Sequence, residues 1–142
     1  MLNKFWYYVL SFTWGILLTL AGCLTTAALY ICGYRPKSWL YGWYFELNGD
    51  WGGLNLGPCI LTSKEPSISL RNHEFGHSIQ NCIFGPFVLV LVCLPSVVRY
   101  WYRIYLTKCK KIPSNELKPY DAAWFEGTTT SLGRKYFFKD WE

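Results

Sequence analysis

The chain has 142 residues, of which 51% are hydrophobic, 20% aromatic and only 16% charged. This length and balance exclude two independent cores and a typical soluble composition, and they favour a single domain associated with a membrane. The net charge of +5 could indicate nucleic-acid binding, but much of it lies beside an apolar segment. We therefore expect a lipid bilayer as partner and no nucleic acid.

Residues 5–34 form an uncharged run at the N-terminus. The run is longer than the roughly 20 residues that a helix needs to cross a bilayer. We predict a transmembrane anchor in residues 1–34, followed by a membrane-associated domain in residues 35–142. A cleaved signal peptide is the alternative, because Lys4 precedes the apolar run and small residues lie within it. The length of the run and its flanking tyrosines favour the anchor.

The next segment contains signals for strands and then for a helix. Residues 35–58 are rich in Gly, Trp and Tyr, with turn signals in "NGD" and "GG", so we expect short strands or a β hairpin. The stretch "TSKE" at 62–65 has the spacing of a capping box. It predicts a helix over residues 63–84, which Gly85 and Pro86 end.

The last third of the chain predicts two more apolar elements. Residues 87–98 are strongly apolar, but they are short for a membrane span and contain Pro95. The aromatic and basic residues 99–111 follow and are typical of a helix end among lipid headgroups. A final helix begins near Asp121 as N-cap and carries Glu126 one turn later. Overall, we expect a mainly α membrane protein with a compact helical metal-binding domain.

The six cysteines favour free thiols over a disulfide framework. Four of them lie within apolar runs and none forms a C-x-x-C pair. Such usage is more typical of a reducing compartment. The cysteines are Cys23, Cys32, Cys59, Cys82, Cys93 and Cys109.

The stretch "RNHEFGHSIQN" holds both histidines of the chain. His-Glu-x-x-His on a helix places His73 and His77 one turn apart on one face, where both can bind one Zn²⁺. Glu74 lies beside that face and can take a proton from a metal-bound water that attacks a carbonyl. An ordinary helix with two partly buried histidines is the alternative. Gln80 and Asn81 lie near the same face, so they are candidates to orient the ligands.

A catalytic zinc site needs a third protein ligand. The chain has no third histidine, and the later cysteines lie in apolar or basic surroundings. We therefore expect a carboxylate as the third ligand. Glu126 is the best candidate because it follows "AAWF" and precedes small residues, so it can point inward from a packed helix. The other downstream acids are Glu116, Asp121, Asp140 and Glu142.

These two motifs resemble those of gluzincin metallopeptidases with membrane helices, such as the HtpX-type and CAAX-processing endopeptidases. The second motif of that family is Glu-x-x-Ala-Asp-x-x-Gly, and the matching stretch here is "EGTTTSLG". Glu126 and Gly133 are kept, whereas Thr129 stands at the alanine position and Thr130 at the aspartate position. The resemblance implies a divergent, shortened member. A threonine hydroxyl can still accept a histidine N–H bond, but without charge, so metal affinity or water activation should be weaker.

The sequence thus predicts a membrane-anchored zinc metallopeptidase that acts on peptides or membrane proteins. His73, His77 and Glu126 would bind zinc and Glu74 would be catalytic. Three alternatives stay open: a non-catalytic zinc-binding relative, a lipid-binding or pore-forming protein that needs no metal, and iron in place of zinc. Site-2-type intramembrane proteases also carry HExxH, but their Asp-Gly ligand motif has no match after His77.

A shared metal also restricts the membrane topology. If His77 and Glu126 meet at one ion, the chain cannot cross the membrane once between them. Residues 87–98 must then be re-entrant, laid against the surface, or packed inside the protein. Arg35, Lys37 and the basic residues 99–111 favour a cytoplasmic catalytic domain, and we expect an integral protein of the plasma membrane.

Overall fold

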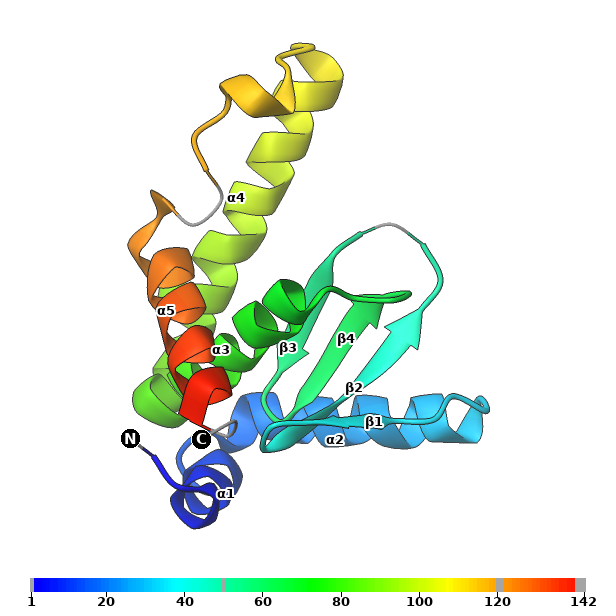
Figure 1. The fold of residues 1–142 in the computed structure, drawn as a ribbon, viewed down its shortest axis with the longest axis vertical. Coiled ribbons are helices and arrows are strands. Elements are labelled where there is room, and N and C mark those ends of the chain that lie inside the picture. Colours follow the sequence, from blue (N-terminus) through cyan, green and yellow to red (C-terminus); the bar gives the residue numbers. More distant parts are fainter. Residues whose placement is uncertain (1, 50, 120–121, 140–142) are drawn as a thin grey trace.

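The chain is mostly helical, with one small sheet, in the computed structural model, which describes residues 2–49, 51–119 and 122–139 (Figure 1). This confirms the predicted mainly α class. Asp121, the predicted N-cap, lies outside the described residues. The elements are α1 (Lys4–Phe12), α2 (Ile16–Ile31), β1 (Lys37–Trp39), β2 (Gly42–Leu47), β3 (Gly53–Leu56), β4 (Cys59–Ser63), α3 (Ile68–Phe84), α4 (Leu94–Ile104) and α5 (Trp124–Lys139).

The predicted strand region forms a four-stranded mixed sheet, which is larger than a hairpin. Its order is β1-β2-β4-β3. Strands β2 and β4 are parallel, whereas β1 and β3 are antiparallel to their neighbours. The side chains of β4 alternate between two cores, as the period of a strand requires. Ile60 packs towards α3, and Cys59 and Leu61 pack on the opposite face with Leu29 of α2.

Helix α3 lies between the sheet and α5 and forms the centre of the molecule (Figure 1). Phe75 and Ile79 of α3 are buried in one cluster with Tyr7 of α1 and Tyr136 of α5. Apolar burial of this kind contributes about 1.5–3 kcal/mol for each large side chain. The histidine helix is therefore fixed from several sides.

The predicted single transmembrane helix over residues 5–34 is wrong in one respect. The run is broken into α1 and α2, whose axes differ by 94°. A hydrogen bond from α3 stabilises this break: Asn81 Nδ2 donates to Gly15 O at 3.1 Å. Gly15 has no Cβ, and a Cβ there would meet the Asn81 amide, so only glycine permits this approach.

The start of the histidine helix also differs from the prediction. Thr62 belongs to β4, where it is buried and its Oγ1 donates to Phe45 O at 3.3 Å, so the capping box at 62–65 is not formed. Helix α3 begins at Ile68 instead, and the Oγ of its N-cap, Ser67, accepts from Leu70 N at 3.1 Å. The predicted end at Gly85 is confirmed, with φ 55°.

The short apolar element predicted at 87–98 is part of a longer helical rod, Leu89–Cys109, which we call the α4 rod. A π-helical turn precedes Pro95, and Leu94 N–H donates to Leu89 O. This wider turn accommodates the missing N–H and the ring of Pro95. The rod is long and apolar enough to cross a membrane, and the bent α1–α2 pair passes the same test if it is taken as one span.

Candidate metal centre

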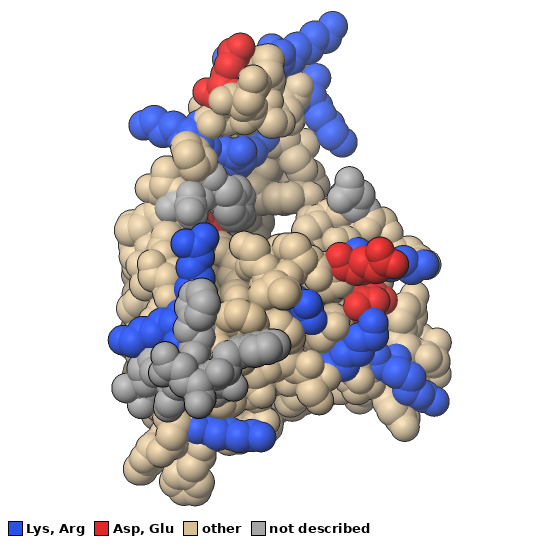
Figure 2. Space-filling model, in the orientation of Figure 1, with Lys and Arg blue, Asp and Glu red and all other residues tan. Residues whose placement is uncertain are grey.

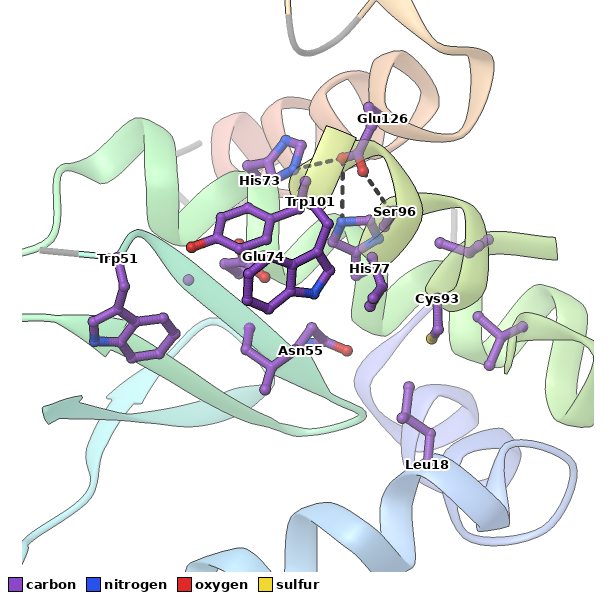
Figure 3. A pocket seen from close by; sticks show the side chains of 16 residues that line it. Leu18, Trp51, Asn55, His73, Glu74, His77, Cys93, Ser96, Trp101 and Glu126 are labelled. Carbon is purple, nitrogen blue, oxygen red and sulfur yellow. Dashed lines mark hydrogen bonds and ion pairs between the residues drawn. The ribbon is translucent and has the colours of Figure 1, made fainter. Parts of the chain in front are cut away.

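The structure brings the three predicted ligands together. His73 and His77 project from one face of α3, and Glu126 projects from the first turn of α5 (Figure 3). Glu126 Oε2 lies 3.1 Å from His73 Nε2 and 3.5 Å from His77 Nε2. One ligand atom from each residue lies within 4.8 Å of the others, so the group could hold a metal ion.

Two glycines allow α5 to approach α3 closely enough to deliver Glu126. A Cβ on Gly76 of α3 would collide with the carbonyl of Thr129, and a Cβ on Gly133 of α5 would collide with the carbonyl of Asn72. Backbone therefore packs directly against backbone at both points. This contact gives a physical reason for the glycine that ends the stretch "EGTTTSLG".

Both imidazoles are oriented through their Nδ1 atoms. His73 Nδ1 lies 3.0 Å from Thr130 Oγ1, and that hydroxyl donates its own proton to Glu126 O. His77 Nδ1 lies 2.9 Å from Gln80 Oε1, and the Gln80 amide is fixed because Nε2 donates to Phe125 O. In both cases the oxygen can only accept, so Nδ1 carries the proton and Nε2 keeps its lone pair for a metal.

The three residues predicted to orient the ligands thus have different outcomes. Thr130 accepts from a ligand histidine at the position where the resembled family has aspartate, as predicted. Gln80 also lies in the predicted place. Asn81 does not, because its amide turns away from the site to Gly15 and Thr19.

The chemistry of the donor set fits a cation. Two imidazole nitrogens and one fully buried carboxylate converge with their lone pairs towards the same point. Three converging acceptors repel one another unless a positive charge lies between them. Two nitrogens and one oxygen suit Zn²⁺, although the same set also suits iron.

The electrostatics of the site attract positive charge. Burial raises the pKa of Glu126, but contacts from His73, His77 and Ser96 outweigh burial and hold that pKa well below its usual range. Burial lowers the pKa of His77, but Glu126 and Glu74 outweigh it and raise that pKa. Glu126 and Glu74 thus favour the protonated form of His77 when no ion is bound, and a metal would compete with this proton.

Glu74 lies beside the three ligands without joining them. It is buried against β3, where a Cβ on Gly53 would collide with the Glu74 carboxylate. Burial raises the pKa of Glu74, and His77 and His73 offset this only in part. A carboxylate in such surroundings holds a proton more readily than an exposed one, which is the property of a general base.

No pattern in the sequence indicates a role for Ser96. Its Oγ donates to Glu126 Oε1 at 2.5 Å and so holds the carboxylate oxygen that does not face the histidines (Figure 3). Ser96 belongs to the α4 rod, which the sequence did not place near the site. Among the other downstream acids, Glu116 lies in a separate turn after the rod, and Asp121, Asp140 and Glu142 lie outside the described residues.

The candidate centre opens into a largely apolar cavity of about 290 Å³. A second, more polar cleft of about 590 Å³ adjoins it and shares His73 and Glu74. The ligands thus lie where an apolar cavity meets a polar cleft. The apolar walls are formed by Leu18, Leu54, Val88, Val92, Val97 and Trp101.

No protein-family model, curated protein or solved structure matches this chain. The resemblance to gluzincin metallopeptidases therefore depends on the HExxH stretch and on the stretch from Glu126 to Gly133 alone. Family membership stays a prediction.

Proposed function

We propose that this protein is a membrane-anchored zinc metallopeptidase. The single observation that carries the proposal is the convergence of His73, His77 and Glu126, with Nδ1 of both imidazoles already bound to acceptor oxygens. The buried Glu74 lies beside this group, where a general base is needed. All four residues belong to two packed helices, so the arrangement is preorganised.

The three ligands and Glu74 would have separate roles in the reaction. A zinc ion held by His73, His77 and Glu126 would lower the pKa of a bound water and polarise the substrate carbonyl. Glu74 would take the proton of the attacking water and pass it to the leaving amine. The apolar walls of the cavity would limit the access of other water, which strengthens these interactions.

The proposed substrates are peptides or segments of membrane proteins. The cavity beside the ligands is mostly apolar, so it favours an apolar side chain next to the scissile bond. In this proposal the bent α1–α2 pair is the membrane anchor, and Arg35 and Lys37 after it favour a cytoplasmic site.

The first test is the metal content of detergent-purified protein. We expect about one zinc per wild-type chain, as for a mononuclear site with three protein ligands, and little zinc in His77→Ala or Glu126→Ala. Asn81→Ala is the matched control, because Asn81 is a buried polar residue of the same helix that turns away from the ligands. Wild-type protein that binds no metal would contradict the proposal.

The second test separates catalysis from metal binding. Glu74→Gln should retain zinc and lose peptide hydrolysis by about 10²–10⁴-fold, because the amide cannot accept the proton. Hydrolysis can be measured on a library of apolar peptides in detergent micelles. Equal activity in this variant would exclude the proposed role of Glu74.

A second candidate function is a non-catalytic zinc-binding membrane protein. The neutral Thr130 beside His73 favours it, because this acceptor lacks the charge of the aspartate in the resembled family. Wild-type protein that binds zinc but hydrolyses no peptide in the same library would support this candidate.

A further inference from the structure

The α4 rod presents a continuous apolar face to the surroundings. Its members recur at helical spacing and are each between 49% and 64% exposed, which is unusual for large apolar side chains. We call this face the apolar stripe; it consists of Val90, Leu94, Val98, Trp101, Tyr102 and Tyr105. Its second half is aromatic, and Trp and Tyr favour the boundary between lipid and water.

The opposite face of the rod carries Arg99 and Arg103 in its second half and binds a segment whose one helical element is the short 3-10 turn Ser114–Glu116. After the rod, residues 110–119 run back along it towards α5 (Figure 1). Arg99 Nη2 donates to Pro119 O at 2.8 Å, and Arg103 Nη1 donates to Lys118 O at 2.6 Å. The rod and the return segment 110–119 are thus joined at Arg99 and Arg103.

This pairing argues against a membrane crossing by the rod. A helix of this length extends about 30 Å, which equals the thickness of the hydrocarbon core. Arg99 is the central residue of Leu89–Cys109, so a crossing would place Arg99 and Pro119 near the midplane of the bilayer. Lipid-exposed irregular backbone and a charged side chain are both strongly unfavourable there.

The positive charge at the end of the rod indicates which kind of surface the apolar stripe would contact. Lys108, Lys110 and Lys111 lie exposed at the far end of the rod, and Figure 2 shows basic side chains gathered at that end. Lysines beside an apolar, aromatic helix face are typical of helices that bind anionic lipid surfaces.

We propose that the α4 rod lies in the plane of an anionic bilayer surface. The apolar stripe would enter the boundary between headgroups and acyl chains, the three lysines would bind anionic headgroups, and the return segment would stay on the water side. Trp101 and Val97 also line the apolar cavity beside the metal ligands, so the cavity would open close to the lipid. The proposal does not depend on zinc or on hydrolysis.

The first experiment tests whether the rod crosses the membrane. Cys109 is exposed at the end of the rod, and the isosteric change Ser131→Cys adds a thiol on the exposed face of α5. Each thiol is tested alone, with the exposed Cys32 changed to serine, in sealed inside-out membrane vesicles treated with an impermeant maleimide. We expect both thiols to react from the same side. Reaction from opposite sides would show that the rod spans and would overturn the proposal.

The second experiment tests the contact with lipid. A polarity-sensitive dye on Val98→Cys should be quenched by nitroxide lipids in proteoliposomes, whereas the same dye on Ser131→Cys should not. Exposed Cys32 and Cys109 are changed to serine in both proteins. A dye on Val98→Cys that stays in water would overturn the proposal, as would crosslinks through this position between two copies of the chain.

The third experiment tests the lysines. At about fivefold for each charge, three lysines that face phosphatidylglycerol should strengthen the partition of the rod about a hundredfold. Quenching at Val98→Cys should therefore be stronger in vesicles with phosphatidylglycerol than in pure phosphatidylcholine. Lys108→Gln, Lys110→Gln and Lys111→Gln together should remove this difference, whereas Lys135→Gln on α5 should leave it. Equal quenching of the wild-type rod in both lipids would refute the role of charge.

Discussion

At the scale of single residues, the ligand geometry depends on neutral hydrogen-bond partners. Gln80 Oε1 and Thr130 Oγ1 each accept from one imidazole, while their own donors are bound to backbone carbonyls. The direction of each hydrogen bond is therefore fixed by a second one. This arrangement selects the tautomer of each histidine without placing a further charge in the site.

We expect Gln80→Leu to weaken zinc binding by about 10–100-fold, because His77 Nδ1 loses its nearer acceptor at 2.9 Å and keeps only the Thr129 hydroxyl at 3.3 Å. Competition with a chromophoric chelator measures the affinity. Asn81→Leu is the control: it removes a neighbouring buried amide that contacts Gly15, so it should lower stability while the folded protein keeps its zinc affinity. Equal affinities in wild type and Gln80→Leu would show that Gln80 has no orienting role.

At Thr130 the acceptor of a ligand histidine can be strengthened instead of removed. Thr130→Asp places a carboxylate at the atom that accepts from His73 Nδ1 and should make the imidazole a stronger ligand, so we expect zinc affinity to rise about tenfold. Thr128→Asp, at an exposed position of the same helix, controls for the added charge. The idea fails if both variants change the affinity equally.

At the scale of elements, local signals could be read from the sequence and distant pairings could not. His73 and His77 are one helical turn apart, so their position on one face of the helix could be predicted from local sequence alone. Thr62 satisfied a local capping pattern, but it pairs in β4 with the distant strand β2. Non-local strand pairing overrides local propensity in this way. The same limit applies to Ser96, because its contact with Glu126 depends on the path of the α4 rod.

The close contact between α3 and α5 leads to a prediction about Gly133. Gly133→Ala would place a methyl group against the Asn72 carbonyl, so we expect unfolding free energy to fall by about 1–3 kcal/mol. Denaturant unfolding in detergent measures this loss. Ser131→Ala, on the exposed face of the same helix, should stay within about 0.5 kcal/mol of wild type. A stable Gly133→Ala variant would mean that the helices can separate slightly without cost.

At the scale of the whole molecule, composition indicated an apolar chain but not its path. An uncharged run such as residues 5–34 has the same composition whether it is straight or bent. The bend depends on Asn81, which is far away in the sequence and becomes its partner only in the fold. The meeting of Glu126 with the histidines was predictable for a different reason, since the chemistry of a metal site requires a third ligand wherever it lies in the chain.

The same requirement makes the metal a long-range crosslink. Its proposed ligands come from α3 and α5, so an ion that binds only the folded state stabilises the contact between them. At free zinc about 100 times the Kd, the gain is about 2.7 kcal/mol, or roughly 10 °C in Tm for a domain of this size. Chelation should therefore lower the Tm of wild type and of Glu74→Gln, whose ligands are intact, but not that of Glu126→Ala. If chelation removed zinc from wild type and left its Tm unchanged, the ion would not join the two helices.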